Sequence, residues 1–277
     1  MRKRIACLLL IILICIGGCS PSSAKNSSFS ILFIDVGQGD AALIECDGHY
    51  MLIDGGDTTA GDKVYSVLEQ KGIQKLDILA ISHLHRDHFG GLTKALTYAS
   101  SIGITISNSS DGKTEAFRAF ERQLSINGSQ ISVPRKGEKY RLESAEIEVL
   151  DTSSSDDNDS LVLLITYQNT RFLFTGDIEE DAQRRILQQY QNENDDPFKI
   201  NVIKMPHHGA DVLVAFVRTF MPDYAIISVG RGNIYGHPYN NTLVMLDQAD
   251  TKVYRTDLNG DILVLSDGKK VSVQPQK

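Results

Sequence analysis

Residues 76–91 read LDILAISHLHRDHFGG, and this stretch decides the fold class. Its first half, Leu76 to Ser82, is a short apolar run that predicts a buried strand. Imidazole and carboxylate side chains, which together suit zinc, manganese or iron, follow within six residues: His83, His85, Asp87 and His88. We therefore predict a metal site at the end of a strand, where sheet proteins place their sites. The alternative is a polar loop with scattered histidines.

The remaining ligands must come from distant parts of the chain, because one run of this kind cannot complete two metal sites. Asp177 follows an apolar run at 171–174, and its carboxylate is suited to bridge two cations. The alternative is that it caps the helix that follows. His207, His208 and His237 also follow apolar runs, so six of the seven histidines fall on three predicted strand-exit loops.

Strands and helices are interleaved along the chain. Asp47-Gly48 between two apolar runs predicts a hairpin, and Gly72 is placed to end a helix that begins near residue 63. Further helices are expected over 91–99 and 179–190. Two sheets packed face to face, with helices on both outer faces, satisfy this pattern and define an α/β fold.

Several further motifs stand in a fixed order. They are DVGQGDA at 35–41, LIDGG at 52–56, the 83–91 run, LFTGD at 173–177, HHG at 207–209 and IISVGRGNIYGHP at 226–238. With them, the chain resembles the soluble metallo-β-lactamase-like hydrolase domain of the ComEC competence proteins, over about residues 29–265. The resemblance covers only the hydrolase part of those proteins. It implies a metallo-β-lactamase αββα four-layer sandwich for residues 29–277.

The resemblance also implies a metal centre. It implies two divalent cations, zinc or manganese, with these ligands: His83, His85, Asp87, His88, Asp177 and His237. Most members of the wider superfamily carry one more histidine between the first run and the bridging aspartate, but no histidine lies between residues 88 and 177 here. Water, Asn158, Asp159 or Ser160 is expected in its place, so occupancy of the second cation position stays open. The missing histidine argues against β-lactam hydrolysis.

The implied chemistry is hydrolysis. Divalent metals lower the pKa of water from about 15.7 toward 7, so hydroxide is available at neutral pH. Asp87 is expected to orient this nucleophile as well as to bind metal. By resemblance to RNase Z, we assign His207 as the donor of the proton that the leaving oxygen needs, with His208 as the second candidate.

Four more side chains are expected near the site. Asp54 is expected to support a metal-binding histidine rather than to bind metal itself. Asp35, Gln38 and Asp40 sit on a glycine-rich turn, and contact of Gln38 or Asp40 with substrate stays open.

The leading functional hypothesis is a surface-anchored phosphodiesterase or nuclease, with DNA as a candidate substrate. Its alternatives are a small-molecule ester, thioester or lactone hydrolase of the same fold, and a non-enzymatic surface-binding lipoprotein. Phosphate contacts need basic side chains, and the site-side loops are expected to offer Arg86, Lys204 and Arg231. No obligate protein partner is inferred.

The first residues are typical of a lipoprotein signal. A basic start, an apolar run and Gly17-Gly18-Cys19 predict a signal peptide at 1–18 with Cys19 acylated, followed by a polar tether at 19–28. The alternative is an uncleaved anchor or an ordinary secretory signal. Lipid on Cys19 would hold the chain on the outer face of a bacterial cell membrane. Removal of 1–18 takes away three basic residues and leaves 25 basic against 35 acidic, a formal charge of −10, which argues against a surface that binds long polyanions.

Overall fold

The computed structural model describes residues 28–155, 158–190 and 198–277. The predicted signal peptide, Cys19 and all of the tether except Ser28 lie outside these described residues. Among the described residues, no helix has both the length and the apolar character needed to cross a bilayer.

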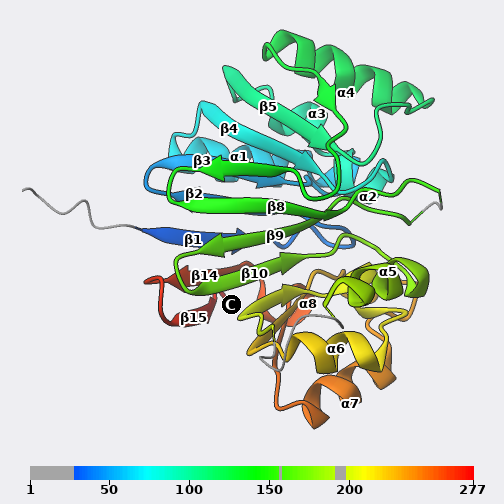
Figure 1. Ribbon diagram of the computed structural model, residues 1–277. Helices are drawn as coiled ribbons and strands as arrows, with labels where there is room; N and C mark the ends of the chain where they lie inside the picture. The colour runs from blue at the N-terminus through cyan, green and yellow to red at the C-terminus, as the bar shows by residue number, and fades with distance from the viewer. Residues whose placement is uncertain (1–27, 156–157, 191–197) are drawn as a thin grey trace, which may run out of the picture.

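Two sheets form the centre of the fold (Figure 1). The first has the strand order β15-β14-β1-β2-β3-β4-β5-β6. Its strands are β1 (Phe29–Phe33), β2 (Ala42–Cys46), β3 (His49–Ile53), β4 (Lys75–Ile81), β5 (Ser101–Ser107), β6 (Ile131–Ser132), β14 (Ile262–Ser266) and β15 (Val271–Pro275). The second has the order β13-β12-β11-β10-β9-β8-β7. Its strands are β7 (Lys139–Leu142), β8 (Ala145–Asp151), β9 (Val162–Tyr167), β10 (Thr170–Phe174), β11 (Val202–Lys204), β12 (Tyr224–Ile227) and β13 (Lys252–Arg255).

Helices cover the outer face of each sheet (Figure 1). The first sheet carries α1 (Gly61–Lys71), α2 (Arg86–Phe89), α3 (Leu92–Ala95) and α4 (Glu115–Ile126). The second carries α5 (Glu180–Tyr190), α6 (Val214–Phe220) and α7 (Asn240–Gln248), and the short α8 (Thr256–Asn259) follows β13. Two 3₁₀ turns, η1 (Thr58–Ala60) and η2 (Pro206–Gly209), complete the described helices. The predicted four-layer αββα sandwich is confirmed.

The central core lies between the two sheets. Alternation along β1 turns Phe29, Ile31 and Phe33 toward the second sheet and leaves the residues between them partly exposed. The Phe29 ring lies 4.8 Å from that of Phe172, and the Phe33 ring lies 5.6 Å from that of Phe174. Stacked aromatic pairs of this kind join β1 to β10 and fix the two sheets against each other.

The predicted helix over 91–99 is too long. The helix α3 ends at Ala95, and the chain continues in turns. Its Leu96 and Ala99 carbonyls accept hydrogen bonds from the side-chain amide of Asn127 in place of helical N–H groups. The predicted end of α1 is confirmed, since Gly72 adopts the left-handed conformation (φ 67°) that glycine tolerates best.

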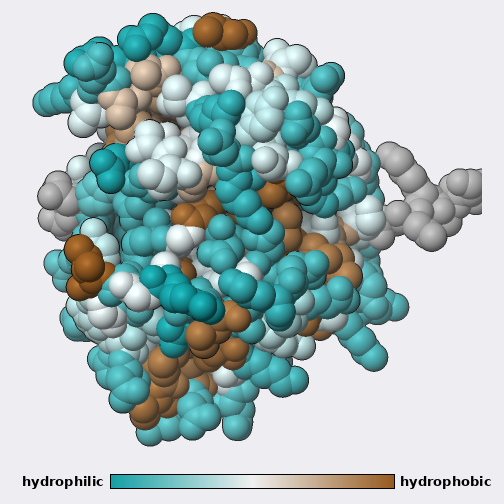
Figure 2. Space-filling model, turned by 180° about the vertical axis from the view of Figure 1, so that it is seen from behind, coloured by the Kyte–Doolittle hydropathy of each residue, from teal (hydrophilic) through white to brown (hydrophobic). Residues whose placement is uncertain are grey.

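The surface seen from behind is mostly hydrophilic (Figure 2). Hydrophobic side chains gather in its lower part, where α6 and α7 lie. Val214 and Val244 on these helices and Met221 at the end of α6 are exposed. Such exposure is ordinary for a folded domain and indicates no function by itself.

Candidate metal centre

The site lies where parallel strands end. In the first sheet β3 pairs with β4 in parallel, and in the second sheet β10, β11 and β12 are parallel neighbours. Parallel strands bring their carboxyl ends to one edge of a sheet. Asp54 follows β3, the 83–88 run follows β4, Asp177 follows β10 and His208 follows β11. The fold therefore gathers loops that are far apart in sequence.

Four of these side chains converge, and we call them the four-ligand group: Asp87, His88, Asp177 and His208. Their donor atoms all lie within 4.8 Å of one another. Asp177 Oδ2 is 3.2 Å from His88 Nε2 and 3.3 Å from His208 Nε2. His208 Nε2 is buried, makes no hydrogen bond, and lies 3.3 Å from Asp87 Oδ2. Two imidazoles and two carboxylates are a donor set that zinc and manganese accept.

His83 and His85 flank this group. The His83 ring lies 4.1 Å from the His88 ring and 4.5 Å from the His85 ring. His83 Nδ1 faces the hydroxyls of Ser82 and Ser160, at 3.1 and 3.4 Å, while its Nε2 is buried without a hydrogen-bond partner. A buried imidazole nitrogen without a partner is costly unless something binds it. The residues present therefore fit a metal on this side of the group as well.

Asp54 supports His88. This buried carboxylate accepts hydrogen bonds from Ser82 N at 2.8 Å, from Ser82 Oγ at 2.7 Å and from His88 Nδ1 at 3.0 Å. The bond to Nδ1 leaves His88 Nε2 facing Asp177. On the opposite side, His208 Nδ1 donates to the Ser228 carbonyl at 2.9 Å, which likewise frees its Nε2. Carboxylate or carbonyl partners of this kind orient metal-binding histidines.

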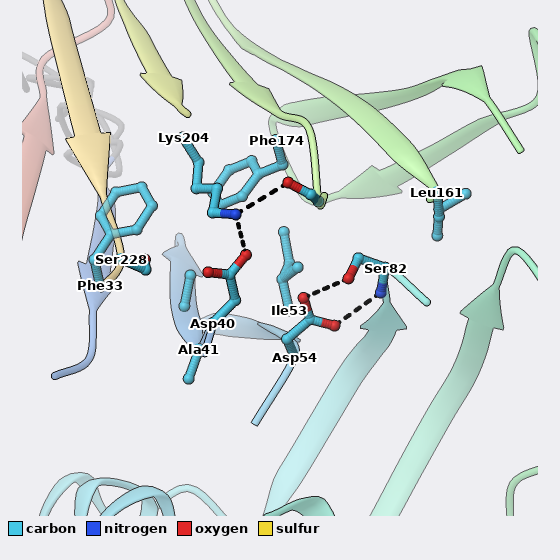
Figure 3. A pocket seen from close by; sticks show the side chains of 12 residues that line it. Phe33, Asp40, Ala41, Ile53, Asp54, Ser82, Leu161, Phe174, Lys204 and Ser228 are labelled. Atoms are coloured by element: carbon cyan, nitrogen blue, oxygen red, sulfur yellow. Dashed lines mark hydrogen bonds and ion pairs between the residues drawn. The ribbon is translucent and has the colours of Figure 1, made fainter. Parts of the chain in front are cut away.

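Lys204 lies beneath the four-ligand group. Its ammonium contacts Asp40 Oδ2, the Gly176 carbonyl at 3.0 Å and Asp177 Oδ1 at 3.4 Å (Figure 3). The sequence had placed Lys204 on a loop open to substrate, and the structure corrects this: it ends β11, a strand inside the second sheet, and is 3% exposed. Burial favours the neutral amine, but the Asp40 and Asp177 carboxylates outweigh it and raise the pKa of Lys204 above its ordinary value.

The group is strongly polarised. Burial alone would raise the pKa of Asp177, but His208, His88 and Lys204 hold it well below the ordinary value. Burial alone would lower the pKa of His88 and of His208, but Asp177 raises both well above the ordinary value, with Asp54 adding to the effect on His88. The site therefore holds its carboxylates ionised and these two imidazoles protonated until a cation replaces the protons.

His237 and His207 lie beside the group. The His237 ring is 6.0 Å from that of His208, and its Nδ1 is buried without a hydrogen-bond partner. His207 Nδ1 lies 3.5 Å from Asp211 Oδ2 and 3.9 Å from Glu179 Oε1. The resemblance implied His237 as a ligand and His208 as the second candidate for proton donor. The structure instead brings His208 into the four-ligand group and leaves His237 in ring contact with it.

The segment expected to replace the missing histidine divides. Asn158 donates to Glu179 Oε1, and Asp159 pairs with Arg185 at 2.7 Å. Ser160 Oγ accepts a hydrogen bond from Asp177 N at 3.0 Å and lies 3.4 Å from His83 Nδ1. Of these three residues, Ser160 is thus the one that touches the centre, and it orients Asp177 and His83.

The glycine-rich turn carries Asp40 to the site. A Cβ on Gly39, where φ is +133°, would lie 2.2 Å from the Asp87 carbonyl oxygen, so this backbone approach needs glycine. Gln38 Oε1 accepts a hydrogen bond from Gly230 N at 3.1 Å and ties the turn to the loop before His237. Asp35 points elsewhere: its N–H donates to Asp261 Oδ1 at 2.8 Å.

A cleft of about 520 Å³ opens beside Asp87. The side chains of Gln38, Asp57, Arg86 and Tyr235 line it together with Asp87. Arg86 pairs with Asp57 at 2.7 Å and keeps 71% of its side chain exposed. The cleft therefore joins a carboxylate of the four-ligand group to an exposed cation and an exposed aromatic ring.

A profile of the metallo-β-lactamase superfamily matches residues 34–188, more than half of the chain, and the chain therefore belongs to this superfamily. It is 28% identical over 263 residues to ComE operon protein 3 of Bacillus subtilis (strain 168), covering 86% of this chain and 33% of that protein. It is 27% identical over 273 residues to Recombination protein 2 of Haemophilus influenzae, covering 93% of this chain and 31% of that protein. The chain spans about a third of the length of these distant ComEC-like relatives.

Solved structures agree on the fold. The metallo-β-lactamase fold protein YhfI from Bacillus subtilis has a TM-score of 0.56 and 10% identity, covering 88% of this chain and 99% of that chain. Tm1679, described as a metal-dependent hydrolase of the β-lactamase superfamily, has a TM-score of 0.50 and 13% identity, covering 82% of this chain and 95% of that chain. At these identities the likeness shows the fold alone. Together with the buried histidine and aspartate cluster, the family fits a metal-dependent hydrolase.

Proposed function

We propose that this chain is a metal-dependent phosphodiesterase that acts on nucleic acid. The observation that carries the proposal is the four-ligand group at the wall of a cleft that also holds Arg86 and Tyr235. The four-ligand group, with His83 and His85 beside it, would hold one or two divalent cations. Bound zinc or manganese would lower the pKa of water and neutralise phosphate oxygens.

Asp87 serves the nucleophile side. Its side chain is 32% exposed, whereas those of Asp177, His88 and His208 are almost completely buried. It is therefore the member of the four-ligand group that a water molecule in the cleft can reach. Burial alone would raise the pKa of Asp87, but His208 and His88 hold it well below the ordinary value. Asp87 thus stays an acceptor that orients the attacking water.

His207 serves the leaving group. Its side chain is 22% exposed and lies outside the four-ligand group, so it remains free to donate a proton. Asp211 and Glu179 both face its Nδ1 and favour the orientation in which Nε2 points away from them. His208 is less suited, because its Nδ1 is bonded to Ser228 and its Nε2 faces two carboxylates.

Arg86 and Tyr235 favour a nucleic acid over a small ester. An exposed guanidinium binds phosphate oxygens, and an exposed tyrosine ring supports base stacking. Tyr235 is 60% exposed and its ring lies 5.7 Å from that of His237. Relatives named for competence and for recombination agree with DNA as the substrate. We further propose that lipid on Cys19 anchors the chain to the outer face of the bacterial cell membrane.

Hydrolysis assays with added zinc or manganese test the proposal. We expect turnover of bis-p-nitrophenyl phosphate and of single-stranded DNA, and none of lactone or thioester panels. His208→Ala should abolish turnover together with metal binding. His49→Ala is the matched control, because this histidine pairs with Asp77 and Glu143 instead of the site.

His207→Ala separates the roles. It should keep metal binding and lower the rate about 10²–10⁴-fold for DNA, whose leaving oxygen needs a proton. For p-nitrophenolate, which leaves without one, it should change the rate little. Turnover of lactones or thioesters in place of phosphodiesters would contradict the proposal, and so would equal losses on both phosphodiesters.

A further inference from the structure

Lys204 is the one lysine or arginine among the buried residues that the structure describes. Its three polar partners all belong to the metal centre or its support: Asp40, the Gly176 carbonyl and Asp177 (Figure 3). An isolated ammonium in such a place would be costly, so its charge must be balanced by these carboxylates. With 3% of its surface exposed, Lys204 is also out of reach of a substrate in the cleft.

Negative charge is in excess around it. Four carboxylates surround the buried histidines of the site: Asp40, Asp54, Asp87 and Asp177. Carboxylates this close repel one another strongly, because interactions between charges are less screened inside a protein than in water. The Lys204 ammonium contacts two of the four and therefore relieves this repulsion from below.

We propose that Lys204 is a built-in counter-ion of the metal centre, which keeps the carboxylates assembled before metal binds and makes the centre bind divalent cations less tightly than the carboxylates alone would. It rests on the metal site of the proposed function and is independent of the substrate. The ammonium and a dication would both be held by Asp177, one on each oxygen. Two positive charges so close repel, and removal of either strengthens the hold on the other.

A role in which Lys204 only positions Asp177 predicts the opposite sign. In that case the loss of Lys204 would let Asp177 turn away and would weaken metal binding. The direction of the change in metal affinity therefore separates the two roles.

Three variants and a control test the proposal in the purified chain, with Zn²⁺ affinity measured by competition with a chromophoric chelator. Lys204→Met should lower the melting temperature of the chelator-treated protein and tighten Zn²⁺ binding at least about tenfold. Asp40→Asn should weaken it, because the ammonium then lacks its main partner. The double variant restores the charge balance and should bind Zn²⁺ within about threefold of the original chain. Lys63→Met, at an exposed lysine–aspartate pair, should change neither quantity.

Weaker or unchanged Zn²⁺ binding in Lys204→Met would overturn the proposal, as would an unchanged melting temperature. Should Lys204→Met fail to fold, the comparison of Asp40→Asn with the double variant decides. The double variant must then bind Zn²⁺ more tightly than Asp40→Asn, and equal or weaker binding would overturn the proposal. All of these readouts are independent of phosphodiester turnover, so a failure of the proposed function leaves them interpretable.

Discussion

Replacement of Asp54 by asparagine tests how far a support residue controls the metal centre. The change keeps the size of the side chain and tolerates the left-handed backbone at this position (φ 57°), which asparagine adopts readily. It removes the charge that accepts the 3.0 Å bond from His88 Nδ1. A hydrogen bond to a charged group contributes about 1.5–3 kcal/mol. Since about 1.4 kcal/mol is a factor of ten, we expect metal affinity to fall about 10–100-fold.

Calorimetric titration of the chelator-treated protein with Zn²⁺ measures this loss, and circular dichroism shows whether the fold is kept. Asp77→Asn is the matched control. Asp77 also accepts a backbone hydrogen bond, from Tyr50 N at 3.0 Å, and also lies next to a histidine, His49, at 3.2 Å. It stands in β4 before the strand reaches the site, so its replacement should leave Zn²⁺ affinity unchanged.

Two results would refute the reasoning. Unchanged Zn²⁺ affinity in Asp54→Asn, with the fold intact, would show that the carboxylate does not orient His88 for metal. An equal loss in Asp77→Asn would show that the effect comes from general destabilisation.

Three further predictions follow from the geometry. Because the carboxylates raise the pKa of His88 and His208, both are protonated at neutral pH, so Zn²⁺ binding should release protons and weaken as the pH falls; titrations in buffers of different ionisation enthalpy measure this, and zero release would contradict it. Phe172→Ala, which empties a site packed 4.8 Å from the Phe29 ring, should lower the free energy of unfolding by about 3–5 kcal/mol in urea titrations, and a loss below about 1 kcal/mol would contradict that packing. Gly39→Ala should displace Asp87 and lower Zn²⁺ affinity, whereas Gly48→Ala, where φ is +84° and the space for a Cβ is open, should cost only about 1 kcal/mol of stability; equal metal affinity in the two variants would be the contrary result.

Local signals carried much of the prediction. The apolar run before His83 and the spacing of the ligands that follow lie within 16 residues, so the strand, the loop and the donor types could be predicted together. Asp54 was predicted to support a histidine, and the structure places its carboxylate on His88. The helix over 91–99 failed because its end depends on Asn127, which no local pattern connects to it.

The sequence by itself determined the α/β sandwich and the kinds of side chain at its strand ends, because hydrophobic periodicity and ligand spacing are properties of short segments. Only the tertiary structure decided which histidine joins the four-ligand group, and it chose His208 over its neighbour His207 and over His237. It also decided that Lys204 lies beneath the centre instead of at its mouth. The physical reason is that strand order and side-chain direction set these contacts, and adjacent residues on one chain point to different sides.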